Sequence, residues 1–483
     1  MYTKDEQKEL LTLIFLTVQK VFSVYNYKLC NDCEAQEFNY KCTIRDKNED
    51  EEYKKDSYIL NENKLVGYFC LKNSVCEFEV LINRAKNCFR DLIFIIKNCI
   101  RTLKSIYQSF CIEAINKAGV AHIIEETIQN SIISIIIGEK HLNSFEFPLV
   151  EQFCELLERL SKWANRTYEG RKIPFSFLVD LNRAKKDAKI FQGLTDFLKD
   201  DASALITDGI SSYISIAAKL EYKVVEYFDA EGDVNDDFPL VPYRFSSFGN
   251  MCIGKNKIGI ILTVQGDILF IKGKKLVFAK RNGEWHRYDY EAFHETLFGD
   301  MPELHRVNQT IVPYEMENKK LSKSLLIDYR MKVKKIYLTC LDVAFARTGG
   351  CFAICLDENI KKIKKDINSF DLHRPFKHRK KGAKIDSKRY ILEDIIVNKK
   401  TFDLLGRKAR QELLGVDGAT VMSTDWKFIT TGAIIDNKIT KSDEDLHGGA
   451  RTKIAKKLSN YGVAIKISAD GYIECYKDMK NIF

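Results

Sequence analysis

Two short segments near the carboxyl end of the chain combine residue types that could bind a ligand and act on it. Asp417-Gly418-Ala419 places a carboxylate beside a glycine, whose missing side chain lets a ligand approach the backbone. The second segment runs His447-Gly448-Gly449-Ala450-Arg451-Thr452-Lys453. At a helix start, it would offer backbone N–H groups, the helix dipole and two cations to a phosphate. Each motif alone is weakly specific, because Asp-Gly is typical of turns and the glycines match no phosphate-loop fingerprint.

The residues around these motifs alternate between helical and strand-like patterns, which predicts an α/β layer fold for 320–483. A helix over about 321–347 should end at Gly349-Gly350, because glycine favours the conformation that terminates helices. Further helices are expected at 400–414 and 452–458. Strands are expected at 351–356, 419–423, 428–435, 463–468 and 472–476.

The order and flanks of the motifs resemble the diadenylate cyclase domain over about the last third of the chain. The resemblance is carried by ARTGGCFAIC (346–355), LLGVDGATVMSTDWKFITTGAII (413–435) and GGARTKIAKKLSNYGVAIKISADGYIECY (448–476). These segments are similar to the family's Thr-Gly before its first core strand, its Asp-Gly-Ala motif, and its Gly-Thr-Arg-His-Arg motif followed by a helix, a serine and a strand. The resemblance implies a mixed sheet flanked by helices.

The resemblance also implies a reaction, in which two ATP-loaded domains meet face to face and form cyclic di-AMP or a related cyclic dinucleotide with release of pyrophosphate. It implies Asp417 and Arg451 as catalytic residues, with Asp417 also binding Mg²⁺ or Mn²⁺. The nucleotide-binding residues that it implies are Thr348, Gly349, Gly418, Ala419, Gly449, Ala450, Arg451, Thr452, Lys453 and Ser468. A homodimer or higher homo-oligomer would follow.

The motif departs from the family pattern at several positions. Thr452 and Lys453 replace a His-Arg pair, and lysine offers a point charge where guanidinium offers two parallel hydrogen bonds. Ala450 replaces a threonine, and Ala469 replaces a glutamate. A catalytically silent nucleotide-binding sensor of the same fold is therefore one alternative. A nucleic-acid-binding regulator that uses the basic insertion 374–389 is another, less favoured because the run lacks interleaved aromatic residues.

The first two thirds of the chain separate by pattern into two regions. Residues 1–168 should be mainly helical, with helical spacing at 4–26, 87–117 and 149–168 and short strands near 37–44 and 65–79. Residues 169–315 should form an α/β sensor-like domain with an antiparallel meander from Ile258 to Phe278 and a helix at 191–200. The resemblance of this part to a sensor is one of arrangement only, its ligand is unknown, and no internal repeat is apparent.

The composition is that of a globular chain, with 45% hydrophobic residues and a net charge of 76 − 67 = +9. No run of about 18 uncharged apolar residues and no secretory signal is apparent, so we expect a cytoplasmic protein without membrane spans. The 14 cysteines are scattered, which favours reduced thiols. A structural zinc at Cys30, Cys33 and Cys42 is not favoured, because their spacing matches no regular zinc motif.

Overall fold

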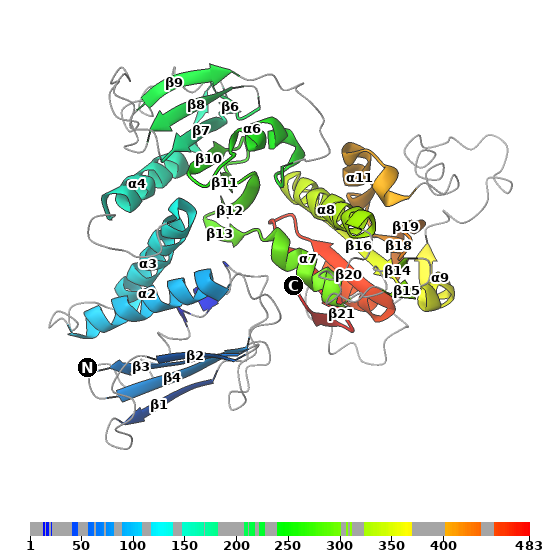
Figure 1. The fold of residues 1–483 in the computed structure, drawn as a ribbon, viewed down its shortest axis with the longest axis horizontal. Coiled ribbons are helices and arrows are strands. Elements are labelled where there is room, and N and C mark those ends of the chain that lie inside the picture. Colours follow the sequence, from blue (N-terminus) through cyan, green and yellow to red (C-terminus); the bar gives the residue numbers. More distant parts are fainter. Residues whose placement is uncertain are drawn as a thin grey trace. The chain divides into compact units, whose positions relative to one another are not determined.

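The computed structural model divides the chain into two compact units, Met1–Asp289 (unit 1) and Tyr290–Phe483 (unit 2). Each unit contains a seven-stranded sheet, so the predicted α/β class is confirmed. Figure 1 shows helices beside the sheet of each unit. The division into three regions stays a prediction. The structure describes residues 13–14, 16–18, 21, 41–46, 57–61, 64–71, 74–81, 89–108, 117–138, 147–168, 170–181, 207–210, 212–217, 222–227, 239–300, 306–307, 310–311, 323–369, 401–435 and 449–483.

Unit 1 begins with an antiparallel sheet in the order β1-β4-β3-β2. The strands are β1 Lys41–Asp46, β2 Ser57–Asn61, β3 Lys64–Leu71 and β4 Ser74–Leu81. Residues 1–168 therefore contain a four-stranded sheet in addition to helices, which is more strand than their sequence predicted. The cause is visible in β3 and β4, which pair over their whole length and are rich in β-branched and aromatic residues.

Three helices follow this sheet, α2 Phe89–Gln108, α3 Lys117–Ile137 and α4 Phe147–Trp163. The sequence did not indicate α3, because its isoleucines lie on every side and give no helical periodicity. Within the described residues, only its segment Gly119–Ile137 is long and apolar enough to span a membrane, and half of that segment is buried. Asn98 of α2 donates to Ser131 (3.0 Å) and Cys154 of α4 donates to Asn130 (3.0 Å), so α3 is tied to both neighbouring helices.

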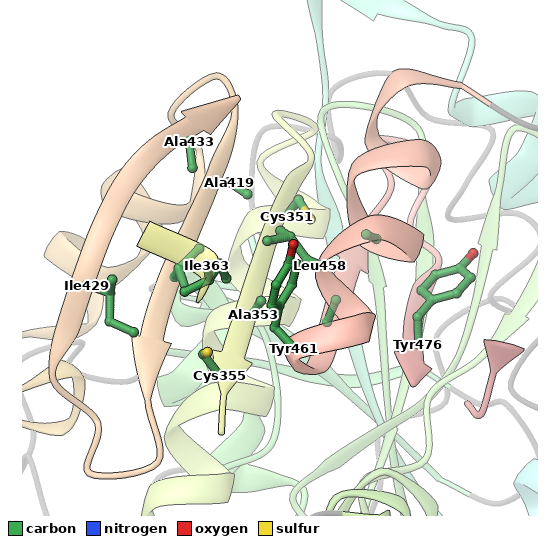
Figure 2. Packing of buried hydrophobic residues seen from close by; sticks show 13 residues of the cluster. Cys351, Ala353, Cys355, Ile363, Ala419, Ile429, Ala433, Leu458, Tyr461 and Tyr476 are labelled. Atoms are coloured by element: carbon green, nitrogen blue, oxygen red, sulfur yellow. The ribbon is translucent and has the colours of Figure 1, made fainter. Parts of the chain in front are cut away.

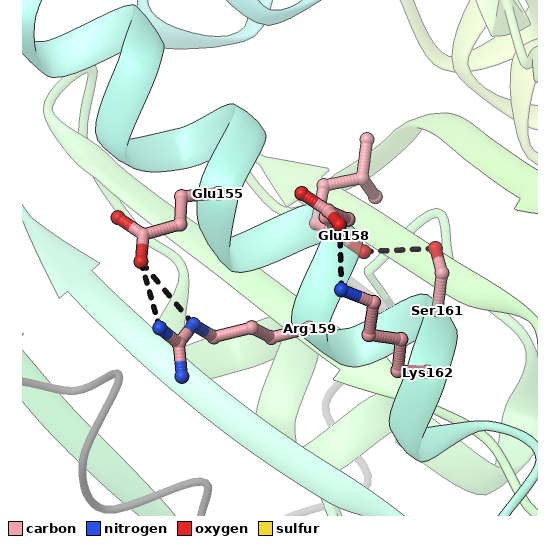
Figure 3. Close-up of polar contacts among 6 residues, drawn as sticks. Glu155, Glu158, Arg159, Ser161 and Lys162 are labelled. Atoms are coloured by element: carbon pink, nitrogen blue, oxygen red, sulfur yellow. Dashed lines mark hydrogen bonds and ion pairs between the residues drawn. The ribbon is translucent and has the colours of Figure 1, made fainter.

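The outer face of α4 is polar (Figure 3). Arg159 pairs with Glu155 at 2.9 Å and Lys162 pairs with Glu158 at 2.6 Å, both one helical turn apart. Lys162 lowers the pKa of Glu158 by hydrogen bonding and charge. Ser161 donates to the Leu157 carbonyl at 2.8 Å. Such pairs are typical of a solvated helix surface and indicate no chemistry.

The large sheet of unit 1 has the order β13-β12-β11-β10-β7-β8-β9. Among its described strands, β7 and β8 pair in parallel and the other neighbours pair antiparallel, and the antiparallel meander predicted from Ile258 to Phe278 is confirmed as β10–β12. The predicted helix at 191–200 lies outside the described residues. The elements are β5 Thr167–Tyr168, β6 Arg171–Lys172, β7 Phe175–Asp180, β8 Ser212–Ala217, β9 Tyr222–Tyr227, α6 Ser246–Met251, β10 Lys257–Leu262, β11 Ile268–Lys272, β12 Lys275–Arg281 and β13 Glu284–Arg287.

The sheet of unit 2 has the order β17-β19-β18-β16-β20-β21-β22, with β16 and β18 parallel and all other neighbours antiparallel. The helices and strands predicted for 320–483 are found near their expected bounds, except that the helix predicted at 400–414 begins at Arg407, after a separate 3-10 turn at Phe402–Leu404. The elements are α7 Tyr290–Asp300, β14 Arg306–Val307, β15 Thr310–Ile311, α8 Lys323–Phe345, β16 Gly350–Cys355, α9 Ile360–Asp366, β17 Ile367–Ser369, η9 Phe402–Leu404, α11 Arg407–Leu414, β18 Ala419–Ser423, β19 Phe428–Ile435, α12 Ala450–Leu458, β20 Gly462–Ile467, β21 Ile473–Lys477 and β22 Lys480–Asn481.

Both faces of the unit 2 sheet are covered. Figure 2 shows the face under α12 and α9, where small side chains gather. Successive residues of β16 point to opposite faces, so Cys351 and Ala353 lie in this cluster while Phe352 stacks on Phe402 of η9 (6.3 Å between ring centroids) on the other. The cluster contains Ala353, Ala419, Ala433, Ala455 and Ala464. These small residues let α12 lie close against the sheet.

Candidate functional site

The predicted site residues of unit 2 lie at one end of its sheet, where β16 and β18 begin and β20 ends. The pairing Gly350↔Ile467 and the parallel pairing Phe352↔Thr420 set this alignment. Parallel strands begin at the same end of a sheet, and an antiparallel neighbour ends there. Gly349 and Gly418 therefore lie directly before β16 and β18, and Ser468 lies directly after β20. We call this end of the sheet the site end. It joins segments separated by about 120 residues of sequence.

Arg451, in the first turn of α12, reaches the site end through Gly349. Its Nη2 donates to the carbonyl oxygen of Thr348 at 3.0 Å. A Cβ on Gly349 would lie 2.8 Å from the Arg451 Nη1 and 3.1 Å from the Ile467 oxygen, and Gly349 has φ +62°. Any other residue there would displace the guanidinium and strain the backbone. The glycine is therefore required for Arg451 to occupy this position.

Gly418 is required for an equally direct reason. Its φ is +96°, and a Cβ would lie 2.6 Å from the carbonyl carbon of Gly432 in β19. The following residue, Ala419, is fully buried, whereas the preceding Asp417 is exposed. Within the described part of the chain, the Asp417 carboxylate has no hydrogen bond or ion pair, so it is available to a ligand.

The start of α12 is open to solvent. Gly449 is the N-cap residue, with extended backbone (φ −67°, ψ 170°) and no side-chain cap, and nothing lies within 4 Å of the place of its Cβ. Gly449, Ala450 and Lys453 are exposed, and Thr452 is half-buried. The first N–H groups of a helix have no acceptor within it, so they remain available to an anion that binds here.

Ser468 lies at the site end, but its hydroxyl belongs to the turn between β20 and β21. The Ser468 Oγ accepts from the backbone N–H of Asp470 at 3.2 Å and lies 3.3 Å from the Asp470 carboxylate. The backbone N–H of Ser468 donates to the Tyr472 carbonyl at 2.8 Å. Its clearest role is therefore to shape this turn.

A buried ion pair, which the sequence did not indicate, fixes the helices that lead into the site. Arg407 of α11 binds Asp342 of α8 through two hydrogen bonds, Nε–Oδ2 at 2.5 Å and Nη2–Oδ1 at 2.9 Å. The α8 helix leads to Thr348, and α11 leads to Asp417. The ion pair therefore fixes α8 and α11 relative to each other, and with them the segments that lead to Thr348 and Asp417. The sequence signal for this pair is one charged residue on the buried side of each helix.

A second unpredicted group lies on the α12 face of the sheet. Lys466 of β20, which pairs with Cys351, forms an ion pair with Glu474 of β21. Tyr476 donates to the same carboxylate at 3.2 Å, and burial and Glu474 raise the tyrosine pKa. Burial raises the pKa of the Cys351 thiol to about 12, partly offset by the charges of Arg451 and Lys466. Charged residues opposite each other on apolar strands are the signal that identifies this group.

Unit 1 contains a cavity of about 790 Å³ lined by residues of that unit alone. Six of its lining side chains are glutamates, contributed by α3, α4 and the turn into β13. Lys280 and Trp285 close one side, with the Lys280 Nζ 5.7 Å from the Trp285 ring centroid. This lining is acidic, so it does not suit a nucleotide phosphate.

Two predicted features fall outside the described residues. The basic insertion 374–389 is one, and Cys30 and Cys33 of the unfavoured zinc site are the other. Cys42 is placed in β1, without a described side chain. Within the described residues, no group of three or more His, Cys, Asp or Glu side chains could hold a metal ion by itself.

Three comparisons with known proteins found nothing similar. No family model matches the chain, and no curated protein or solved structure matches it. The resemblance to the diadenylate cyclase domain therefore rests on the motifs of this sequence.

Proposed function

We propose that unit 2 is a nucleotide second-messenger synthase that condenses two ATP molecules into cyclic di-AMP, or a related cyclic dinucleotide, and releases pyrophosphate. The observation that supports this most is the convergence of Thr348-Gly349, Asp417-Gly418 and the first turn of α12 at the site end, through the Arg451–Thr348 hydrogen bond. The rest of the chain would control the reaction as a sensor. A cytoplasmic location fits a substrate that is made there.

The available groups suit phosphoryl transfer, which depends on positioning and charge neutralisation more than on covalent catalysis. A ribose 3′-oxygen would bond to the α-phosphorus of the opposite ATP as the bond from that phosphorus to the bridging oxygen breaks. The unpaired Asp417 carboxylate can accept the hydroxyl proton. Arg451 and the N–H groups around Ala450 can stabilise the charge on the phosphate oxygens.

A divalent cation fits this site only together with the nucleotide. Mg²⁺ is usually held by one or two carboxylates, water and substrate phosphates. Asp417 supplies one exposed carboxylate, and no described cluster supplies a full protein ligand set. Asp417 would therefore hold Mg²⁺ or Mn²⁺ that arrives with ATP, and the ion would neutralise charge on the leaving pyrophosphate.

The proposal is tested by incubating the full chain with ATP and Mg²⁺ or Mn²⁺ and analysing the products by mass spectrometry. We expect a cyclic dinucleotide and pyrophosphate from the natural sequence and none from Asp417→Asn. Asp425→Asn is the matched control, because Asp425 is an exposed carboxylate just beyond the other end of β18. Equal loss of product in both variants, or no product from the natural sequence, would contradict the proposal.

A catalytically silent nucleotide sensor is the second candidate. The observation that favours it is the presence of Thr452 and Lys453 where the family has His-Arg. Arg451 is still held against Gly349, which preserves a phosphate-binding group without the flanking ones. ATP binding without any product, in the same assay, would identify this function.

A further inference from the structure

Six strands of the two large sheets have the same connectivity, β7–β12 in unit 1 and β16 with β18–β22 in unit 2, whereas the edge strands β13 and β17 have no counterpart among the described strands. In unit 1, β7 lies between β8, which is parallel to it, and β10, which is antiparallel to it. In unit 2, β16 is central, with β18 parallel on one side and β20 antiparallel on the other. The parallel strand in each unit then pairs with the next strand, β9 or β19, as an antiparallel neighbour. Chain order and pairing agree throughout these strands.

The pairing registers agree as well. The antiparallel ladder β7–β10 runs from Phe175↔Leu262 to Asp180↔Lys257, and β16–β20 runs from Gly350↔Ile467 to Cys355↔Gly462. If Phe175 is matched to Gly350 on this basis, Phe177 matches Phe352. The parallel ladders then begin at the same position, Phe177↔Ile214 in unit 1 and Phe352↔Thr420 in unit 2. Independent folds would have no reason to share both registers.

The strands that follow repeat the same turns. Thr263 N–H donates to the Asp267 carbonyl at 2.8 Å, as Ser468 N–H donates to Tyr472 at 2.8 Å. The next turn has positive φ at two successive residues in each unit, Gly273 and Lys274 in one and Asp478 and Met479 in the other. Without a gap, 257–278 and 462–483 share six identical residues. The identical pairs are Ile260/Ile465, Gly266/Gly471, Ile268/Ile473, Lys272/Lys477, Lys275/Lys480 and Phe278/Phe483.

The helices before these strands cover corresponding faces. Trp163 at the end of α4 packs on Phe175 (6.0 Å between ring centroids), and Val343 of α8 lies against the matched Gly350. On the opposite face, α6 lies against Gly259 of β10, where a Cβ would be 2.8 Å from Phe248. Ala464, which matches Gly259, lies in the cluster under α12. The correspondence thus includes both helical layers.

We propose that 147–281 and 323–483 are two copies of one fold, and that only the second copy binds nucleotide, so that the second ATP of the reaction is held by another copy of this chain. The reaction in this inference is the one of the proposed function, on which the inference rests. The number of nucleotide sites per chain is inferred from the comparison of the two sheets. The physical basis is that the first copy keeps the scaffold, while its described residues lack the groups of the site end at the matched positions.

At the positions that match Gly349, Gly418 and Arg451, the first copy has different residues. Pro174 matches Gly349, and proline cannot adopt the positive φ that makes room for Arg451. Ser212 matches Gly418, according to the parallel ladders. Eleven residues before β10 and β20 (257 − 246 and 462 − 451) stand Ser246 and Arg451, each in the first turn of its helix. Counted back from the matched strand, the described part of the first copy therefore has a serine where the second copy has its guanidinium.

The first copy retains an Asp-Gly pair before its parallel strand, but its carboxylate is already used. The Asp208 Oδ1 accepts from the backbone N–H of Ile210 at 2.8 Å and of Ser212 at 3.1 Å. Asp417, by contrast, has no partner within the described residues. The condensation of two ATP molecules therefore requires the 323–483 copy of two separate chains.

Calorimetric titration of the full chain with a non-hydrolysable ATP analogue and Mg²⁺ tests the count of sites. We expect one analogue per chain, weakened about tenfold or more by Arg451→Ala and unchanged by the matched Ser246→Ala. Two analogues per chain, or one that is sensitive to Ser246→Ala and not to Arg451→Ala, would overturn the inference alone. No binding would overturn the proposed function, and the inference with it.

A mixing experiment tests the partner. Natural chains are combined with increasing excess of Asp417→Asn chains, and product per natural chain is measured after exchange. If the second ATP comes from another chain, a ninefold excess should lower product per natural chain about tenfold, since most partners are then inactive. Unchanged product per natural chain, with exchange verified by labelled subunits, would show that one chain completes the site and would overturn the inference.

Discussion

The two sheets share their registers and differ at one end, and this difference separates what the fold requires from what the site requires. The matched strands β7 and β16 are apolar and buried, with Phe177 and Phe352 at matched positions. At the site end, unit 2 has glycines of positive φ and an unpaired carboxylate, whereas unit 1 has Pro174 and a carboxylate bound to its own turn. The scaffold therefore persists without the site, because apolar alternation sets register and the turn residues do not.

Among the described residues, a buried Arg–Asp pair is found in each unit, in a different place. In unit 2, Arg407–Asp342 joins the helices that lead into the site end. In unit 1, Arg281–Asp267 lies at 3.2 Å with both side chains almost fully buried, and Asp267 belongs to the turn between β10 and β11. A buried Arg–Asp ion pair thus joins the two helices that lead to the site end in unit 2, and it fixes the turn between β10 and β11 in unit 1.

The largest expected effect is a crossed pair of substitutions at the two Asp-Gly motifs. Asp417→Ala should lower product formation by about 10²–10⁴-fold while changing stability by less than about 0.5 kcal/mol, since this carboxylate is exposed and unpaired. Asp208→Ala should leave product formation intact and destabilise unit 1 by roughly 1–2 kcal/mol, since two backbone N–H groups lose their acceptor. Product assays and denaturant unfolding measure both. Matching effects of the two substitutions would remove the distinction between the units.

The next effect is on the buried ion pairs. Asp342→Ala and Asp267→Ala should each destabilise their own unit by about 3–5 kcal/mol, because each leaves a buried guanidinium without its partner. Only Asp342→Ala should also weaken nucleotide binding, since α8 and α11 lead to Thr348 and Asp417. Hydrogen exchange of the β16 and β10 amides reports each unit separately. Weaker binding in Asp267→Ala would argue against this assignment.

A smaller effect is expected at the glycines of the two motifs. Gly418→Ala should cost about 2–5 kcal/mol, because its Cβ would meet the backbone of β19 at 2.6 Å in addition to the strain of positive φ. Gly209→Ala should cost about 1–2 kcal/mol, since φ is +70° and the nearest atoms are side-chain carbons at 3.3 Å. Exchange of β18 and β8 amides compares the two. A greater loss in β8 would be inconsistent with the contacts described.

The smallest effect concerns alkaline pH and should be common to both units. Burial raises the pKa of Cys252 in unit 1 and of Cys351 in unit 2 to about 12, from the ordinary thiol value of 9.0. A raised thiol pKa means that the folded state holds its proton more tightly, so stability is full below pH 9 and falls as pH rises toward 12. At pH 10 each thiol should cost about 1 kcal/mol. Thermal unfolding at pH 8 and pH 10 measures this, with Cys→Ala variants as controls; a loss that persists in the variants would have another cause.

Local patterns determined much of the fold. The meander of β10–β12, the buried strand β16 and the helix that starts near Arg451 follow from apolar alternation, glycine turns and helical spacing, which act over a few residues. The helix α3 did not follow, because an all-round apolar helix has no periodicity until its neighbours are known. The sequence also did not predict that the fold is repeated, since six identical residues between 257–278 and 462–483 are too few to indicate a repeat.

The sequence by itself determined which residue types were present for phosphate chemistry: one carboxylate beside a glycine, and one guanidinium at a helix start. Only the tertiary structure decided that these groups lie at the same end of one sheet, because strand register brings Gly349, Gly418 and the first turn of α12 there from distant parts of the chain. It also decided that Asp417 is unpaired and Asp208 is not. Hydrogen-bond partners depend on three-dimensional proximity, which residue type and spacing along the chain do not specify.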